Sequence, residues 1–558
     1  MRLLKAGIAA ASLSLGVGVL HTHQTDSLYP GFSIGVLVSS GILLLTLSLT
    51  RRLTKRRFHV LLAAIVTVAV LYRGYTFGFP TSLIGMDPDG YALGIERVIR
   101  AGRTDAIEVG FYDRAPLFYV LPAVLAILGD ASASESMIVY PVLIGAVLPL
   151  TAAVLVRWVL GRDTYRAAGM AAIGAGVATT TVWFSYWPIA QTLALLYWCI
   201  LLVSVIRFYS TGSKADFALI AFVLLGQIFT HKLPLLVIAP TFVTLFLIVF
   251  VRGHPRLKWT NFRIQVGWVF VLLAASTLVI QQLYVTDFLG FVALKMASLL
   301  SQEAAAVRPA SPTFSHAEVI APDLLGVIHR QLYAFVLLPV SGLAWAYAAY
   351  RYRDRPAADV VLTAAAVTVA FVAVGVVATS DVIAPYRGTL FAEPVLMALV
   401  AVGLAALLRS RRTGWIAVVV MFVVLTSQVM TPVAAPDYDE STRIYLSSSE
   451  VEAKSFGYRY VSEPIRTDSF FEHEDVRPVT AVEGFRRAHY QEMNSSLFNR
   501  NISERGYDYV MYRNIDTYTS QGGWVRLTWD PDSELRRNFS KVYVNGQTRL
   551  YHDIAVSE

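Results

Sequence analysis

Two carboxylates, Asp87 and Asp89, stand one residue apart in the stretch GMDPDGY at residues 85–91. Paired carboxylates can bind a divalent cation such as Mg²⁺ or Mn²⁺ through their oxygens. One carboxylate alone can act as general base toward an acceptor hydroxyl. The same letters also suit a solvated turn, because Asp, Pro and Gly all favour turns. Catalysis, metal binding and a simple turn are therefore the three interpretations of this stretch.

The composition places these acids in a membrane protein. Of 558 residues, 55% are hydrophobic and 15% are charged, and the mean hydropathy is +0.54. Apolar runs recur from Leu3 to Met430, and many approach the roughly 20 residues that cross a bilayer as a helix. The single cysteine, Cys199, lies inside such a run, which leaves no disulfide framework and no thiolate metal site to consider.

The basic residues indicate how the chain is oriented in the bilayer. Much of the net charge of +8 falls in short loops such as residues 51–57, 351–355 and 409–412. This pattern is typical of cytoplasmic loops, and we expect no nucleic acid as a partner. About thirteen spans alternate correctly if the short run at 116–129 does not cross. These spans are residues 3–20, 31–49, 58–78, 136–160, 167–182, 189–206, 216–230, 233–251, 265–283, 332–350, 359–379, 389–408 and 415–430.

This topology puts four features on the exterior face of the membrane. They are the first loop (79–135) with its two acids, the loop at 284–330, the short segment SDVIAPYRG (380–388) and the C-terminal residues 431–558. Every group that could do chemistry is then expected on one side. The first run is expected to stay as an anchor, because a clear cleavage site is missing before His21.

The C-terminal residues have the pattern of a soluble domain. YDYVMYRN (507–514) and KVYVNGQTRLYHD (541–553) alternate apolar and polar residues as strands do. Asn545-Gly546 is predicted to form the two-residue turn of a hairpin. We expect a small α/β domain here.

The order of these features resembles a known family. A membrane helix is followed by an exterior loop that opens with a D-x-D-type acid motif, and APLFY (115–119) then leads to an interfacial helix. Over residues 58–430 this resembles the GT-C superfamily of membrane glycosyltransferases, in particular its polyprenyl-phosphate-sugar transferases. The tail SKVYVNGQTRLY (540–551) is similar to archaeal dolichyl-phosphate-mannose mannosyltransferases of N-glycosylation. Two helices before residue 58 and the proline inside the acid pair depart from the family pattern.

The resemblance implies a fold and an activity. The fold would be an all-α polytopic GT-C membrane domain with a C-terminal soluble α/β domain, divided into residues 1–57, 58–430 and 431–558. The activity would be transfer of one sugar, mannose, from dolichyl or polyprenyl phosphate to a glycan or glycoprotein acceptor, such as an S-layer glycoprotein, on the exterior face of the cell membrane.

The resemblance also suggests roles for individual residues. Asp87 would be the general base, and Asp89 would support it or help to bind a cation. A metal is optional, because Arg and Lys can stabilise a single leaving phosphate directly. Arg387, His231 and Lys232 are the candidates for binding that phosphate, and an interface arginine and a loop lysine are the alternatives. Weaker candidates are Arg73, Arg114, Lys295 and Arg308.

A transporter remains an alternative, whereas an oligosaccharyltransferase is not expected. A polytopic transporter or lipid-linked sugar flippase would share the many helices, but internal repeats or charged residues within the spans would be expected. We expect the apolar runs to be nearly free of buried charge. An oligosaccharyltransferase of the same superfamily would carry a W-W-D-type motif, and TWD (528–530) is too weak a match. VWFSYWP (182–188) is interpreted as an interfacial aromatic belt, and His316 with Glu318 as a weak metal pair.

Overall fold

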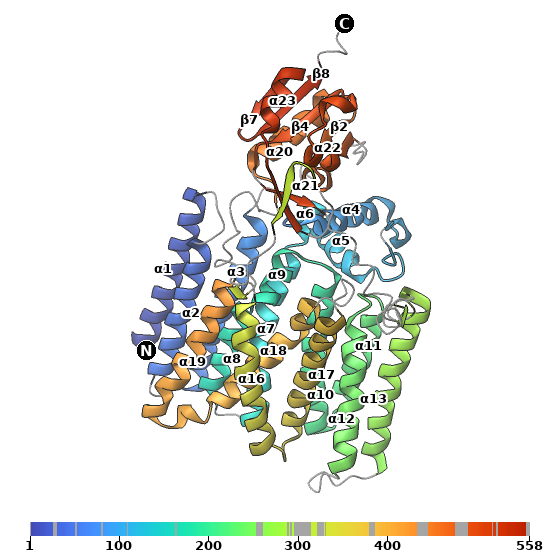
Figure 1. Ribbon diagram of the computed structural model, residues 1–558. Coiled ribbons are helices and arrows are strands. Elements are labelled where there is room, and N and C mark those ends of the chain that lie inside the picture. The colour runs from blue at the N-terminus through green and yellow to red at the C-terminus, as the bar shows by residue number, and fades with distance from the viewer. Residues whose placement is uncertain are drawn as a thin grey trace.

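The computed structural model shows a bundle of long helices with a smaller strand-containing domain at one end (Figure 1). We call the end of the bundle that faces this domain the domain end, and the other the opposite end. The structure describes residues 2–25, 31–50, 53–79, 82–108, 110–161, 164–252, 261–286, 290, 293–294, 314–320, 328–329, 331–378, 385–431, 445–474, 489–515, 517–520 and 523–553.

Each of the thirteen expected spans overlaps a helix of the bundle, but not every one of these helices passes as a membrane span. Among the described residues ten helices are long and apolar enough to cross a membrane, or eleven if the bent pair α8 and α9 counts as one span. The fold expected from the sequence, a polytopic helical membrane domain, is therefore confirmed. The bundle helices are α1 (Arg2–Thr25), α2 (Gly31–Leu49), α3 (Lys55–Gly78), α7 (Val139–Leu160), α8 (Tyr165–Val177), α9 (Thr179–Tyr186), α10 (Ala190–Thr211), α11 (Lys214–Ile228), α12 (Pro234–Arg252), α13 (Asn261–Ile280), α16 (Leu332–Arg351), α17 (Pro356–Ala378), α18 (Pro385–Leu404) and α19 (Arg411–Met430).

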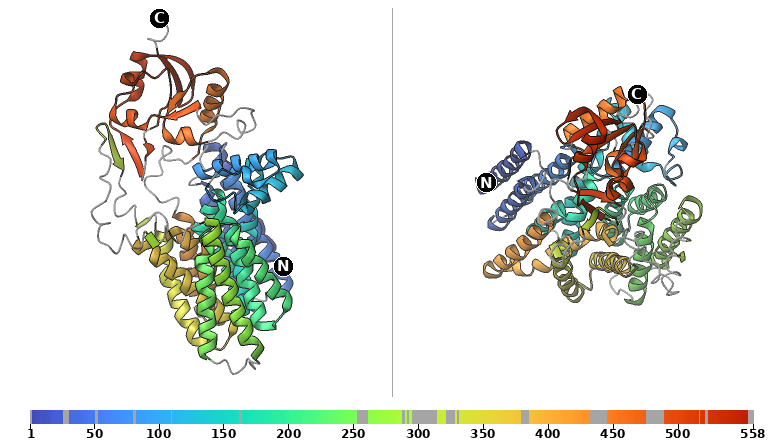
Figure 2. Two further views of the ribbon diagram at one scale, coloured as in Figure 1. Left: turned by 90° about the vertical axis from the view of Figure 1, so that its right-hand side faces the viewer. Right: turned by 45° about the horizontal axis from the view of Figure 1, so that its top comes forward.

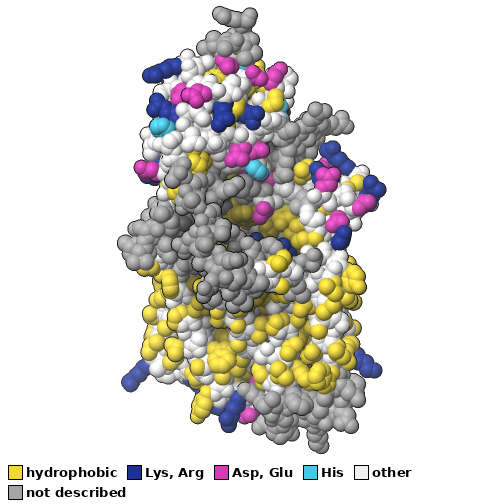
Figure 3. Space-filling view, turned by 45° about the vertical axis from the view of Figure 1, so that its right-hand side comes forward, with side chains coloured by type: hydrophobic (Ala, Val, Ile, Leu, Met, Phe, Trp, Pro, Cys, Tyr) yellow, Lys and Arg dark blue, Asp and Glu magenta, His cyan; other side chains and the backbone are white. Residues whose placement is uncertain are grey.

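Burial separates the inner helices from those that face lipid. In the most apolar 18-residue stretch of α18, 89% of the residues are buried, whereas in the corresponding stretch of α16 only 22% are buried. A helix that is apolar all round can be buried in this way because it needs no polar face. Figure 3 shows the result on the surface, a belt of hydrophobic side chains with charged side chains gathered above and below it. The belt marks where the bilayer surrounds the protein.

Small residues explain how α1 packs on α2. A Cβ added at Gly18 would lie 3.2 Å from the Cα of Gly35, so the two backbones approach closely at these glycines. The hydroxyl of Ser39 donates a hydrogen bond across the same interface to the carbonyl of Ala11, at 2.6 Å. In lipid, small residues and interhelical hydrogen bonds usually stabilise helix association, because burial of apolar surface alone gives little driving force there.

The first loop folds into short helices at the domain end. They are α4 (Met86–Ala101), η1 (Thr104–Ala106), α5 (Leu117–Gly129) and α6 (Ala133–Ser136). Figure 2 shows them, in light blue, on top of the bundle and below the level of the C-terminal domain. With 13 residues, α5 is too short to cross a bilayer. It packs on α4, where a Cβ at Gly94 would lie 2.4 Å from the ring of Tyr119.

The C-terminal residues form an α/β domain with two sheets, as expected. One sheet has the strand order β3-β2-β4-β8-β7, parallel among β3, β2 and β4 and antiparallel in the rest. The other has the order β1-β6-β5 and is antiparallel. The elements are β1 (Ala317–Ile320), α20 (Ser448–Tyr460), β2 (Ile465–Thr467), α21 (Ser469–His473), β3 (Tyr490–Glu492), α22 (Asn494–Asn499), η8 (Ser503–Arg505), β4 (Tyr509–Arg513), β5 (Thr517–Ser520), β6 (Gly523–Leu527), α23 (Pro531–Asn538), β7 (Phe539–Asn545) and β8 (Thr548–Asp553).

The hairpin of β7 and β8 forms where expected, but its turn lies one residue later. Asn545 is paired with Thr548 in the ladder, so the turn residues are Gly546 and Gln547 rather than Asn545-Gly546. The backbone φ angle is positive at Gly546 (+55°) and not at Gln547. Glycine at the first central position is what the type II′ hairpin turn prefers, which explains the shift of register.

One strand of the C-terminal domain comes from the 284–330 loop of the bundle. β1 pairs antiparallel with β6, with Ala317 opposite Leu527. The amide of His316 donates to the carbonyl of Phe498 at 3.0 Å, and its carbonyl accepts from Thr528. The segment with His316 and Glu318 is therefore an edge strand of the sheet that connects the loop to the domain.

Among the described residues no group of three or more His, Cys, Asp or Glu side chains could hold a metal ion.

A buried ionic cluster ties the core of this domain together. The guanidinium of Arg513 donates to both carboxylate oxygens of Asp468, at 2.6 and 2.8 Å, and to Glu450 at 3.3 Å. All three side chains are 3% exposed or less. Because the two carboxylates are so close, they raise the pKa of Arg513 although burial alone would lower it.

Candidate functional site

The stretch GMDPDGY forms the start of helix α4 and is not a free turn. Gly85 is the N-cap, with φ +84° and ψ 158°, and the helix begins at Met86. A Cβ at Gly85 would lie 2.7 Å from the indole ring of Trp187, so only glycine fits beneath this ring. Asp87 and Asp89 then fall in the first helical turn, where negative charge is favoured by the exposed backbone N–H groups.

The two acids point to different environments. Asp87 is exposed, whereas Asp89 is 2% exposed and faces the protein interior. Residues two apart on a helix project from nearly opposite sides, so these carboxylates do not converge on one ion. The two carboxylates therefore do not fit a shared Mg²⁺ or Mn²⁺ ion. Asp87 is the acid available to a substrate.

Asp87 lies beside three tyrosines and one arginine. Surrounding protein raises the pKa of Asp87 by desolvation, and the positive charge of Arg387 acts in the opposite direction. The charge of Asp87 in turn helps to raise the pKa values of Tyr91, Tyr112 and Tyr119, after burial, which is the main cause. The hydroxyls of Tyr91 and Tyr112 are 3.4 Å apart. The acid is therefore more basic than an ordinary aspartate and lies beside a group of tyrosine rings.

Arg387 comes from the first turn of α18. Its side chain is half-buried, and its guanidinium carbon lies 5.9 Å from the ring centre of Tyr386. Its Nε is buried and has no hydrogen-bond partner among the residues that the structure describes. A buried guanidinium nitrogen of this kind is costly unless an anion binds to it.

Lys232 and His231 approach from the turn between α11 and α12. The ammonium of Lys232 lies 5.6 Å from the ring centre of Phe111. Burial lowers its pKa, and the charge of Arg387 lowers it further. Arg387 and Lys232 are thus close enough to repel one another, an arrangement that binding of a phosphate would relieve.

His231 is neutral in this setting. The side chain is 4% exposed, and its pKa is held well below the ordinary value by burial, then by Arg387 and Lys232. Its Nδ1 accepts a hydrogen bond from the amide of Leu233 at 3.2 Å, so the ring proton resides on Nε2. The ring is a structural element of the turn that can offer one N–H donor, rather than a cation.

Sequence reasoning missed the glutamines that hold this turn. At the end of α13, a π-helical segment, η2 (Gln281–Thr286), brings Gln281 and Gln282 to the turn. Gln281 donates to the carbonyl of His231 at 3.1 Å, and Gln282 donates to that of Lys232 at 3.1 Å. Adjacent glutamines at the end of an apolar run were the signal that could have identified them, because a buried amide needs such partners.

Arg73, a weaker candidate for phosphate binding, is buried inside the bundle. It is 0% exposed and donates to the carbonyls of Ala175 and Gly176 at the end of α8. It also donates to the hydroxyls of Thr181 and Ser185 on α9, at 3.2 and 3.1 Å. These groups occupy its donors across the break between the two helices, which is bent by 46°.

Glu393 on α18 completes this break from the other side. It is 0% exposed, and its two oxygens accept from the amides of Thr180 and Thr181, at 2.8 and 2.9 Å. A cation thus meets the carbonyl end of α8, and an anion meets the amide end of α9, as the helix dipoles favour. The expectation of spans nearly free of buried charge was wrong, because Arg73 and Glu393 stabilise backbone groups that the break leaves unpaired.

The aromatic segment at 182–188 lies against the site. Trp187 covers Gly85 at the start of α4, and the ring of Phe184 is 5.9 Å from that of Tyr386. These side chains are buried or half-buried. The interfacial belt expected from the sequence stays a prediction, but these side chains pack against the acid motif, because the break in the span turns α9 toward it.

The structure thus brings together Asp87, Arg387, Lys232 and His231, from α4, α18 and the turn after α11, with Asp89 directed inward. Arg114 instead lies at the surface, where it contacts the carbonyl of Tyr284. Lys295 and Arg308 lie outside the described residues.

No protein-family model and no curated protein matches the sequence. Among solved structures, the chain is similar to the oligosaccharyltransferase of Archaeoglobus fulgidus tethered to an acceptor peptide, with a TM-score of 0.50 and 11% identity over 83% of this chain and 70% of that one. It also matches the AglB oligosaccharyltransferase of the same organism in complex with an inhibitory peptide and a dolichol-phosphate (TM-score 0.49, 12% identity, 81% of this chain and 69% of that one). ArnT from Cupriavidus metallidurans, bound to undecaprenyl phosphate, matches with a TM-score of 0.48 and 11% identity over 90% of this chain and 99% of that one. At such identity the first likeness shows the fold alone, a polytopic helical membrane domain that carries a further domain.

Proposed function

We propose that this chain is a glycosyltransferase that takes a single sugar from a lipid-linked phosphate donor at the domain end of the bundle. The observation that carries the proposal is the meeting of one exposed, unusually basic carboxylate with two mutually repelling cations, Asp87 with Arg387 and Lys232. A transferase of this kind needs both a base for the acceptor and positive charge for the leaving phosphate.

The chemistry would proceed as an inverting displacement. Asp87 takes the proton of the acceptor hydroxyl while that oxygen forms a bond to the anomeric carbon of the donor sugar. The bond between this carbon and the phosphate oxygen breaks, and the electron pair leaves with the phosphate. Arg387 and Lys232 stabilise the developing charge on that oxygen through charge-assisted hydrogen bonds, and His231 can add its Nε2–H. The raised pKa of Asp87 improves it as a base near neutral pH.

The membrane fold suits a lipid donor. The carrier chain would lie along the hydrophobic belt and place its phosphate at the level of Arg387. We assign dolichyl or polyprenyl phosphate as the carrier and mannose as the sugar, on the family resemblance of the sequence. The acceptor would be a glycan or glycoprotein, held by the C-terminal domain, and the domain end would face the exterior.

A second candidate is block transfer of a whole glycan, as an oligosaccharyltransferase performs. It is favoured by the likeness in fold to the Archaeoglobus enzyme. Single-sugar transfer is preferred here because the sequence offers only the weak TWD match at 528–530.

The test compares surface glycans from cells that lack this protein. The cells are complemented with the wild-type chain, with Asp87→Asn, or with Asp113→Asn, a matched change of a half-buried acid in the same loop that pairs with Arg114. We expect deletion to shorten the glycan by one hexose, and the wild type and Asp113→Asn to restore it. Asp87→Asn, inserted at normal level, should fail to restore it. Loss of the whole glycan would instead support block transfer, and an unchanged glycan would contradict both proposals.

A further inference from the structure

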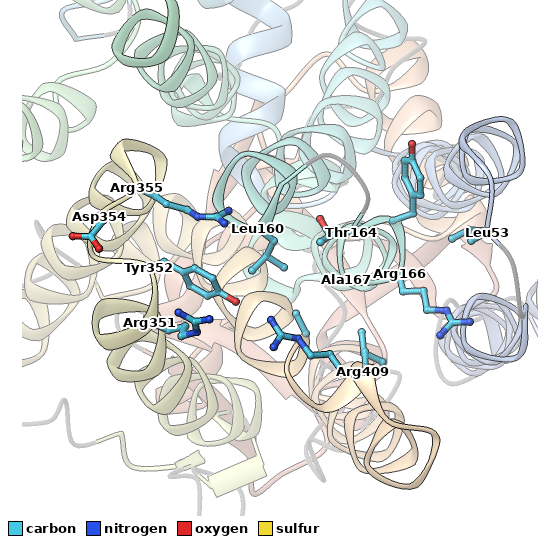
Figure 4. Close-up of a pocket in the computed structure, with 13 residues that line it drawn as sticks. Leu53, Leu160, Thr164, Arg166, Ala167, Arg351, Tyr352, Asp354, Arg355 and Arg409 are labelled. Atoms are coloured by element: carbon cyan, nitrogen blue, oxygen red, sulfur yellow. The ribbon is translucent and has the colours of Figure 1, made fainter. Parts of the chain in front are cut away.

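A cavity of about 570 Å³ opens at the opposite end of the bundle, far from Asp87. The turn after α7, the turn between α16 and α17, and the η5 segment (Leu407–Arg409) before α19 all contribute to its lining. Figure 4 shows these side chains around the cavity. A volume of this size is in the usual range for a pocket that holds a small ligand.

Four arginines line the cavity, and two of them are engaged in the fold. The guanidinium of Arg166 donates to the carbonyl of Thr50 at 2.8 Å, and that of Arg355 donates to the carbonyl of Val159 at 2.6 Å. Arg355 also lies over the ring of Tyr352, 5.4 Å from its centre. These two hydrogen bonds hold the walls of the cavity in place, and because their acceptors are backbone carbonyls they do not cancel the positive charge of the arginines.

The other two arginines remain available. Arg351 ends α16 and Arg409 ends the η5 segment, and among the described residues neither guanidinium makes a hydrogen bond or ion pair. Figure 4 shows them on either side of the hydroxyl of Tyr352, while Asp354 points away from the cavity. The bias of basic residues toward one membrane side explains their presence at this end, but not their convergence from two helices onto one hydroxyl.

The tyrosine between them is well buried. Tyr352 is 8% exposed, and burial, then Tyr347, raises its pKa, while the charges of Arg409 and Arg351 act in the opposite direction. Its hydroxyl is hydrogen-bonded to the side chain of Tyr347 and, by turning its O–H, can donate to an anion that both guanidinium groups bind. Two guanidinium groups and a hydroxyl form a donor set that matches the oxygens of a phosphate.

The remaining lining indicates how far a ligand would extend. Leu53, Leu160 and Leu408 also line the cavity, so an apolar wall lies beside the cationic one. We propose that this cavity binds a phosphate-bearing ligand. The guanidinium groups of Arg351 and Arg409 and the hydroxyl of Tyr352 would donate hydrogen bonds to the phosphate. The phosphate could come from the headgroup of an anionic lipid in the adjacent leaflet or from free phosphate in solution. The site is independent of the function proposed for the domain end.

The test uses the purified full-length chain in a maltoside detergent. Three probes are titrated separately by calorimetry: dioctanoyl phosphatidylglycerol, inorganic phosphate, and dioctanoylglycerol, which has the same chains and lacks the phosphate. We expect saturable binding of at least one phosphate-bearing probe and none of dioctanoylglycerol. Binding of phosphatidylglycerol alone would identify a lipid headgroup, and binding of both probes with equal affinity would identify the phosphate as the whole ligand.

The variants separate this site from general surface charge. Arg351→Gln with Arg409→Gln should weaken binding by about tenfold or more, since each charge-assisted contact contributes on the order of a few-fold. Arg353→Gln is the control, because this exposed residue stands in the same turn, outside the cavity lining. It should keep the affinity within about twofold. Unchanged melting of the double variant would show that it is folded. Absence of binding by both phosphate probes, or equal binding by wild type and folded double variant, would overturn the proposal.

Discussion

Replacing Gly85 with alanine should damage both the stability of the chain and the site. The backbone at Gly85 has φ +84° and ψ 158°, a region that residues other than glycine rarely adopt. The new Cβ would also lie 2.7 to 3.0 Å from three atoms of the Trp187 indole. The change therefore combines backbone strain with a steric clash at the start of the helix that carries Asp87.

The magnitude follows from these two terms. Strain in this backbone region costs about 1–3 kcal/mol, and overpacking against a ring costs about 1–3 kcal/mol more. Gly102 at the other end of α4 is a matched control, because it has φ +66° and a Cβ there would meet nothing within 4 Å. Gly102→Ala should cost only the strain of the left-handed region, about 1–2 kcal/mol.

Activity should separate the two variants further. A displacement of about 1 Å at a catalytic group can reduce a rate on the order of 100-fold. We expect Gly85→Ala to lose activity on this scale and Gly102→Ala to stay close to wild type. The assay combines thermal unfolding in detergent with sugar transfer by purified protein at matched insertion level.

A double variant identifies the cause. Trimming the ring with Trp187→Ala in the Gly85→Ala background should recover about 1–3 kcal/mol through a favourable coupling energy, since the clash disappears. If Gly85→Ala matches Gly102→Ala in both assays, or if the coupling energy is zero, the packing of Trp187 on Gly85 does not position α4.

Three further predictions concern buried charge and pH. Glu393→Gln should destabilise the chain by about 1–3 kcal/mol in thermal unfolding, because an NH₂ group would face a backbone N–H. The control Glu108→Gln, at an exposed position, should change stability by no more than about 0.5 kcal/mol. Equal melting of the two variants would contradict the role of Glu393 at the helix break. Arg513→Met should cost about 3–5 kcal/mol by leaving two buried carboxylates without their guanidinium, which limited proteolysis of the C-terminal domain would detect as faster cleavage, and an unchanged rate would argue against the cluster. Because Asp87 must be ionised to act and the charge of Arg387 lowers its pKa, Arg387→Gln should move the acid limb of the kcat/KM profile to higher pH, and a shift to lower pH would show that Asp87 is not the group that titrates.

The membrane architecture could be predicted because lipid imposes strong rules. Backbone groups in a bilayer must be satisfied within helices, so hydropathy alone located the spans. The broken span α8–α9 escaped prediction because its stability comes from Arg73 and Glu393, which are 320 positions apart in the sequence. Each looked like one isolated polar residue in an apolar run. Their meeting with the two helix ends at the break is a tertiary property, which a local pattern does not contain.

The candidate site was predictable in its residues but not in its geometry. Asp87, Arg387 and Lys232 stood out as charges beside apolar runs at one expected membrane face. The sequence did not separate Asp87 from Asp89, because the start of α4 depends on Gly85 fitting under Trp187, a contact between segments about 100 positions apart. Neutrality of His231 likewise depends on burial and on two cations from other parts of the chain.

The most direct test of the account is single-turnover transfer of a radiolabelled sugar from polyprenyl phosphate by purified Asp87→Asn. Asparagine keeps the size of the side chain and removes the base, so the account predicts a rate reduced on the order of 100-fold or more, with donor binding retained. The control variant Asp113→Asn should react at the wild-type rate. If Asp87→Asn transfers sugar as fast as wild type, Asp87 is not the base and the central claim is wrong.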